Sequence, residues 1–163
     1  MSEALAIREK HDGALAERSS VRLWLRLLSC TMAIEKDVQR RFAAHGTTLA
    51  RFDLLAALDR HPDGMTMGAL SRALLVSNGN VTQLVQKLAK DALVAIAPSP
   101  ADRRASIVRL TQAGRADFAA LAAAHHDWID GLLAGMDAPA REQLYQALGA
   151  LKRAIAKGQS LGS

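Results

Sequence analysis

Apolar residues recur at steps of three and four along most of the chain, the spacing that places side chains on one face of an α-helix. The first such stripe runs from Ser20 to about Ala44 and contains Val21, Trp24, Leu25, Leu28, Met32 and Val38. It stops at Gly46, because glycine readily takes the left-handed conformation found at helix ends. The Ala-rich, charged stretch from Met1 to Arg18 is compatible with either a frayed helix or an arm.

Three further helices are predicted by a capping residue followed by an apolar stripe. Thr48 caps a helix that ends before the turn at His61-Pro62-Asp63-Gly64. Thr66 and Ser77 cap two short helices that are separated only by Leu75-Val76. Two helices joined by so few residues must cross steeply, which is the geometry of a helix–turn–helix unit.

The period changes after the second short helix. Leu93–Ile96 and Ile107–Leu110 are short apolar runs typical of strands, and the basic stretch between them is too rich in proline for a helix. These two strands therefore form a hairpin. Thr111 and Asp137 then cap two long helices, so the chain is predicted to be mainly α-helical.

Composition narrows the class of protein. With 163 residues, 50% of them hydrophobic and 23% charged, the chain can form one domain with a core. No apolar run approaches the roughly 20 residues that cross a membrane. The start lacks the basic and apolar segments of a signal peptide, so we expect a cytoplasmic protein. The single cysteine, Cys30, excludes an internal disulfide, and we expect a buried small residue there, with a redox switch as the alternative.

The sequence gives little support for a catalytic site or a metal site. We see no nucleophile–base pair, phosphate-cradling glycine loop or closely spaced pair of carboxylates, so we expect no enzyme and no catalytic residue. The histidines at 45, 61, 125 and 126 lack the spacing of metal ligands, so neither a metal nor another cofactor is expected.

The net charge of +5 is modest, but its location is informative. The segment from Thr66 to Arg115 holds seven basic and two acidic residues, whereas the rest of the chain holds fourteen of each. The whole basic excess therefore falls on the two short helices, the hairpin and the residues just after it. A concentrated basic segment of this kind favours binding to a polyanion.

Two motifs resemble the MarR family of winged helix–turn–helix transcriptional regulators. The first comprises Thr66–Leu70, then Val76–Thr82 with the apolar stretch Leu84–Leu88. The second, Asp102-Arg103-Arg104 followed by Ile107–Thr111 and Gly114, is similar to the wing signature of that family. The resemblance covers about Val21 to Lys157. It departs at Ala92, where that family has a glycine that relieves a left-handed turn, and no arginine follows.

The resemblance implies a single domain over residues 1–163. A winged helix–turn–helix lobe would occupy 48–110, with a two-stranded or three-stranded wing, and dimerisation helices would occupy 20–45 and 112–157. It also implies a homodimer that binds palindromic double-stranded DNA, as a repressor rather than an activator. The stripe of the first helix and the apolar faces of the last two would form the dimer interface, with an intramolecular core as the alternative for about half of these residues. On the last two helices they are Trp128, Ile129, Leu132, Leu144, Leu148 and Leu151.

The candidate DNA contacts lie on the helix that begins at Ser77 and on the wing. Asn and Gln side chains can pair with adenine edges, Thr can meet a thymine methyl group, and Gly79 would let the DNA backbone approach. By resemblance, Arg104 enters the minor groove, Asp102 braces the wing and Arg103 contacts a phosphate. The alternative is a polar face that is only solvated. The candidates are Ser77, Asn78, Asn80, Thr82, Gln83, Gln86, Lys87, Asp102, Arg103 and Arg104.

The resemblance further implies a small-molecule effector bound between the dimerisation helices and the DNA-binding lobe. Aromatic rings can stack a ligand ring, and Arg22, Arg26, Arg51 or the Arg40-Arg41 pair can hold an anionic group. An aromatic acid or its coenzyme A thioester fits this chemistry, as for family members that govern aromatic-acid catabolism. The candidate lining residues, for which ordinary core packing is the alternative, are Trp24, Leu28, Ser29, Met32, Arg51, Phe52 and Leu55.

A different class of function is also compatible with these patterns. The chain can be a small helical ligand-binding or protein-interaction domain without specific DNA binding, whose basic hairpin is incidental. Steep salt dependence of DNA affinity would separate the two functions, because it reports the release of counterions from DNA.

Overall fold

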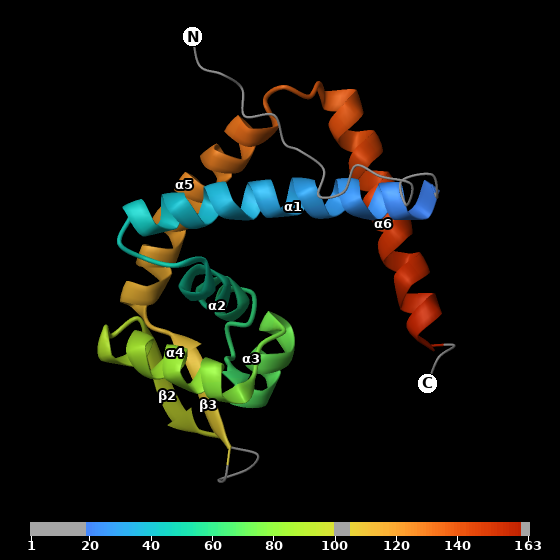
Figure 1. The fold of residues 1–163 in the computed structure, drawn as a ribbon. Coiled ribbons are helices and arrows are strands. Elements are labelled where there is room, and N and C mark those ends of the chain that lie inside the picture. The colour runs from blue at the N-terminus through green and yellow to red at the C-terminus, as the bar shows by residue number, and fades with distance from the viewer. Residues whose placement is uncertain (1–18, 100–104, 161–163) are drawn as a thin grey trace. The chain divides into compact units, whose positions relative to one another are not determined.

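The computed structural model describes residues 19–99 and 105–160. Its elements follow the order α1 (Ser19–Ala44), α2 (Leu49–Asp59), β1 (Met65–Thr66), α3 (Met67–Leu74), α4 (Asn78–Lys90), β2 (Val94–Pro98), β3 (Ser106–Leu110), α5 (Gln112–Leu133) and α6 (Ala138–Ser160) (Figure 1). The chain divides into two compact units, Met1–His125 and His126–Ser163, and the boundary falls inside α5. The predicted mainly α-helical class is confirmed.

The helix starts predicted from capping residues are confirmed. In each case a side-chain oxygen accepts a hydrogen bond of 2.8 to 3.4 Å from the backbone N–H three residues further on, which satisfies one of the free donors of the first turn. These caps are Thr48, Thr66, Ser77, Thr111 and Asp137. The predicted left-handed end of α1 is also present, since Gly46 has a φ of +70°.

The wing is a three-stranded antiparallel sheet in the order β1-β3-β2. Strands β2 and β3 pair from Val94 opposite Leu110 to Pro98 opposite Ser106. The two-residue strand β1 is the third strand of the sheet and pairs with β3, with Met65 opposite Val108. The turn before it must contain glycine, because a Cβ at Gly64 would lie 2.5 Å from the Ile107 side chain and φ there is +88°. The structure thus selects the three-stranded form of the predicted wing.

The core of the lobe lies between α2, α3, α4 and the sheet. On α4, Val81, Val85 and Leu88 are fully buried, at the i, i+4, i+7 spacing of one helix face. Leu70 of α3 and Leu58 of α2 pack into the same cluster. Burying each large aliphatic side chain stabilises the fold by about 1.5 to 3 kcal/mol, so this face fixes the orientation of α4.

An aromatic cluster joins α1, α2 and the first part of α5. The Phe52 ring lies 5.0 Å from Phe42, 5.5 Å from Phe118 and 4.8 Å from His125, measured between ring centroids. His125 also stacks on Phe42 at 5.7 Å. Separations of this size are the favourable range for aromatic pairs. All four residues belong to the unit Met1–His125, so the cluster attaches α1 to the lobe.

The structure corrects one expectation for α1. Cys30, which we expected to be buried, is exposed. Within the predicted stripe, Leu25 and Val38 are buried, whereas Trp24 and Met32 are 58% and 50% exposed in the single chain. The other two buried residues of α1 are Ser29 and Phe42.

The second unit contains the end of α5 and all of α6. None of the described side chains of α6 is buried. Leu132, Leu144 and Leu148 are 36 to 45% exposed, and Tyr145 is 71% exposed. Trp128, Ile129 and Leu151 are half-buried. Within the described residues, these helices therefore present an apolar surface. None of the described helices is both long and apolar enough to cross a membrane.

Candidate nucleic-acid interface

Helix α4 has one buried face and one exposed face. Gly79, Gln83, Gln86 and Lys90 follow one another at the spacing i, i+4, i+7, i+11, and all four are exposed. At about 100° per residue, this row lies opposite the buried stripe that begins at Val81. Helix α4 therefore presents its amide and basic side chains away from the lobe.

The predicted residues of α4 divide into two groups. The side chains of Asn78, Asn80, Gln83, Gln86 and Lys87 are exposed. Ser77 and Thr82 instead serve the backbone: the Ser77 hydroxyl caps the helix, and the Thr82 hydroxyl donates to the Asn78 carbonyl oxygen at 2.9 Å. The structure thus leaves these five polar side chains available to an external partner.

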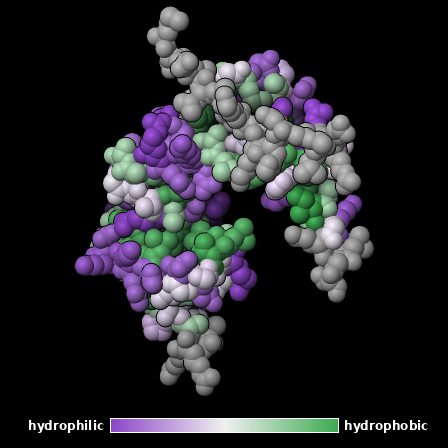
Figure 2. All heavy atoms as spheres, viewed as in Figure 1, coloured by the Kyte–Doolittle hydropathy of each residue, from purple (hydrophilic) through white to green (hydrophobic). Residues whose placement is uncertain are grey.

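Three of these side chains are brought together in an open groove. Asn80, Gln83 and Lys87 line about 310 Å³ of space together with Val76 and with Ala50 of α2. Hydrophilic side chains surround patches of apolar ones on the face of the molecule drawn in Figure 2. A groove with two amides, one ammonium group and an apolar floor offers both hydrogen bonds and contact area.

The wing extends from the same lobe. The Ser99 N–H donates to the Ala105 carbonyl oxygen at 2.8 Å, which closes the β2–β3 hairpin at the last described residues on either side of the tip. The predicted wing residues Asp102, Arg103 and Arg104 lie outside the described residues. Their roles at the DNA remain predictions.

Sequence reasoning omitted Lys90 from the candidate set. Its place four residues after Gln86 puts it on the exposed row, so the helical spacing alone was sufficient to find it. Conversely, Arg109 contributes to the basic excess but serves the fold, because its Nε donates to the Asp63 carbonyl oxygen at 2.8 Å. Part of the basic excess therefore holds the wing to the turn before β1.

The C-terminal end of α4 is held from two sides. Arg51 of α2 forms an ion pair with Asp91, with 2.8 Å between Nη2 and Oδ2. The Thr111 hydroxyl, at the start of α5, donates to the Ala92 carbonyl oxygen at 2.8 Å. Gly114 is required at this junction, because a Cβ there would lie 1.9 Å from the Leu93 carbonyl oxygen. These contacts tie the C-terminal end of α4 to α2 and to the start of α5.

The predicted effector residues do not converge on one cavity. Phe52 and Leu55 are buried in the lobe, and Ser29 is buried on α1. Leu28 is half-buried, whereas Trp24 and Met32 are exposed. Arg51 alone of this set lines a cleft of about 430 Å³, which the α1–α2 loop forms with Leu93 and the first half of α5.

The other arginines proposed to hold an anion have different surroundings. Arg41 donates to Asp37 at 2.6 Å, and Arg40 donates to the same carboxylate. These two hydrogen bonds hold the pKa of Asp37 below its ordinary value of 3.8. Arg22 and Arg26 border a shallow depression on α1. Among the described residues, no three metal-ligating side chains form a group.

Comparison with known proteins gives a consistent assignment. A model of the MarR family matches residues 45–105. The transcriptional activatory protein BadR of Rhodopseudomonas palustris is 38% identical over 96 residues, which are 58% of this chain and 55% of that relative. The match thus spans about half the length of BadR.

Solved structures extend the similarity to most of the chain. A MarR family transcriptional regulator from Silicibacter pomeroyi is 32% identical, with a TM-score of 0.72 over 88% of this chain and 99% of that one. PcaV from Streptomyces coelicolor, solved in complex with its natural ligand, has a TM-score of 0.64 at 18% identity over 89% of this chain and 99% of its own. At that identity PcaV supports the fold alone.

Proposed function

This chain belongs to the MarR family of DNA-binding transcriptional regulators, and we propose that as a homodimer it represses from a palindromic operator and is released by a small anionic aromatic ligand. The exposed row on α4 and its groove carry this proposal. They place amides and a lysine on the outer face of a rigidly anchored helix, as readout in the major groove requires.

The basic excess of residues 66–115 supports the same function. Lys87 and Lys90 are exposed on α4 and Arg72 is exposed on α3, so three cations of this segment are accessible on the helix–turn–helix unit. We assign Arg103 and Arg104, which lie outside the described residues, to phosphate and minor-groove contacts. Two copies of the segment in a dimer carry a formal net charge of +10, which favours binding to a polyanion.

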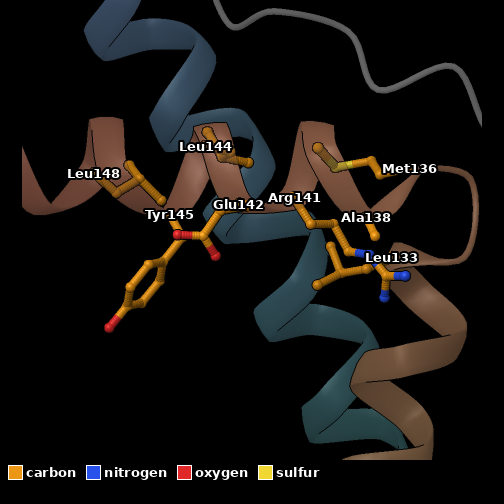
Figure 3. Close-up of a pocket in the computed structure, with 8 residues that line it drawn as sticks. All are labelled: Leu133, Met136, Ala138, Arg141, Glu142, Leu144, Tyr145 and Leu148. Atoms are coloured by element: carbon orange, nitrogen blue, oxygen red, sulfur yellow. The ribbon is translucent and has the colours of Figure 1, made fainter.

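The apolar surface of the second unit supports a dimer. Leu133, Met136, Leu144, Tyr145 and Leu148 line a groove of about 490 Å³ between the end of α5 and the first turns of α6 (Figure 3). Arg141 and Glu142 stand at the same groove and can pair with charges of a second copy. We assign this surface to the partner subunit, because apolar patches of this kind mark contacts between proteins.

The cleft beside Arg51 supports an anionic ligand. A carboxylate in the cleft would form a bidentate pair with the Arg51 guanidinium and compete with Asp91 for it. Since Arg51 holds the end of α4, the same contact would alter how α4 meets DNA. An aromatic acid or its coenzyme A thioester would place its apolar part against Leu93 and Leu121.

Activation instead of repression is the second candidate. The name of BadR, the relative with 38% identity, describes an activatory protein. A reporter gene placed behind the operator distinguishes activation from repression when its expression is measured with and without the regulator. Repression requires that expression rise when the regulator is deleted.

Selection from random double-stranded DNA with the full chain tests DNA binding. We expect a palindromic site whose dissociation constant rises steeply with salt. Lys87→Ala and Arg104→Ala should each weaken binding and reduce the slope of log affinity against log salt by about 1 per subunit, while the exposed Lys152→Ala of α6 serves as the control. Recovery of no preferred sequence would overturn the proposed function.

Release by ligand is tested on the same complex. Aromatic carboxylates and coenzyme A thioesters are titrated while operator binding and tryptophan fluorescence are followed. Arg51→Ala should weaken the response, and Asp91→Asn should strengthen it because the competing carboxylate is removed. Absence of a response to every aromatic anion would overturn this part of the proposal.

A further inference from the structure

The conformation of α4 does not explain why residue 79 is a glycine. It is the second residue of α4, and its φ is not in the left-handed region, which among the described glycines occurs at Gly46 and Gly64. Glycine is the poorest helix former apart from proline. Neither the backbone conformation nor the stability of the helix therefore explains this residue.

Packing within the chain does not require Gly79 either. A Cβ built at this position meets nothing within 4 Å. Gly114 is the contrasting case, because a Cβ there would come within 1.9 Å of the Leu93 carbonyl oxygen. The space left by the missing side chain at Gly79 lies outside the chain.

The position of Gly79 identifies what can use this space. Gly79 begins the exposed row that continues with Gln83 and Gln86, and it lies between Asn78 and Asn80. The Ser77 cap and the hydrogen bond from Thr82 to the Asn78 carbonyl oxygen fix the first turn in place. The first turn of a recognition helix is the part that approaches base edges most closely.

We propose that Gly79 is a positioning residue of the DNA interface, and this rests on the proposed function. Without a side chain at the N-terminal end of the exposed row, the backbone of α4 approaches the operator closely. Asn78 and Asn80 are short side chains, so they reach base edges only when the backbone is close. A methyl group at position 79 holds the helix away and removes those contacts, while the longer lysine and arginine side chains still reach phosphates.

The test compares Gly79→Ala with Gly158→Ala in the full chain. Gly158 is a matched control because it is also helical and exposed, a Cβ there also meets nothing within 4 Å, and it lies outside the helical range 112–157 assigned to the dimer. Three quantities are measured for each: the Tm, the dissociation constant for the selected operator, and that for unrelated DNA of equal length at the same salt concentration.

For Gly79→Ala we expect a Tm equal to or up to about 3 °C above that of the wild type, because alanine favours the helix. We expect at least a tenfold loss of operator affinity and less than a twofold change for unrelated DNA. Gly158→Ala should retain operator affinity within twofold. A purely structural role would lower the Tm or weaken both kinds of DNA binding together.

The inference is overturned if Gly79→Ala binds the operator within twofold of the wild type or loses as much affinity for unrelated DNA. It is also overturned if the Tm of Gly79→Ala falls, or if Gly158→Ala loses as much operator affinity. A wild-type protein that selects no DNA sequence overturns the proposed function itself. The two failures are distinguishable because the first leaves specific binding by the wild type intact.

Discussion

Replacing Ala92 with glycine should stabilise the protein. Ala92 follows α4 in the left-handed conformation, with a φ of +57°, and the Leu93 N–H donates to the Leu88 carbonyl oxygen at 2.9 Å, as at a glycine-terminated helix. The Cβ of an L-residue is crowded in this conformation, which costs about 1 to 2 kcal/mol. Ala92 is exposed, so its methyl group returns little burial energy.

The opposing effect is smaller. Glycine gives the unfolded chain more conformations, which costs about 0.4 to 1 kcal/mol on folding. The net expectation for Ala92→Gly is a stabilisation of about 0.5 to 1 kcal/mol. In a chain of this size 1 kcal/mol corresponds to about 2 to 4 °C, so the Tm should rise by about 1 to 4 °C.

The assay is thermal unfolding followed by circular dichroism, with urea unfolding to obtain the free energy. Protein concentration is held constant, because the Tm of a dimer depends on it. Ala123→Gly is the matched control: it is exposed within α5, where alanine has no strain, and it should destabilise by about 1 kcal/mol. An Ala92→Gly variant that is no more stable than the wild type would refute the reasoning.

Three other predictions concern the junction between α4 and α5 and two contacts of α1. Gly114→Ala should destabilise by about 3 kcal/mol, since its Cβ collides with the Leu93 carbonyl oxygen; urea unfolding that shows a loss under 1 kcal/mol would contradict this. Phe42→Ala, in which a fully buried ring is removed, should cost about 3 to 5 kcal/mol in the same assay. The hydrogen bond from Arg41 lowers the pKa of Asp37 in the folded protein. The stabilisation that the ionised carboxylate gives is therefore present above the unfolded pKa of 3.8 and is lost as the pH falls through the lower pKa of the folded state. Asp37→Asn should thus cost about 0.5 kcal/mol at pH 7 and progressively less in acid, and a pH-independent difference would count against the assignment.

The ends of the helices could be predicted because their causes are local. A hydroxyl or carboxylate at Thr48, Thr66, Ser77, Thr111 or Asp137 binds a backbone N–H three residues away, whatever the rest of the chain does. The buried face of α4 could be predicted for the same reason, whereas the mismatch at Ala92 followed from the resemblance to the MarR family. Most of the exposed residues of the candidate DNA-binding helix followed from that one face.

Contacts between distant segments required the tertiary structure. The pairing of Arg51 with Asp91, forty residues apart, has no sequence signal, and neither does the approach of Gly114 to the Leu93 carbonyl. Strand β1 is two residues long, so no apolar alternation marks it. The apolar stripe of α1 did not show that Trp24 and Met32 remain exposed within the chain.

The sequence by itself determined the helices and the β2–β3 hairpin, where helices α2 to α6 begin, and which face of α4 is buried, because periodicity and capping act over two to four residues. Only the tertiary structure decided which arginines are occupied by internal partners, which aromatic rings fill the core and where an open cleft remains. Those outcomes depend on which elements meet, and chain segments far apart in sequence meet through the sum of many burial energies rather than through any local pattern.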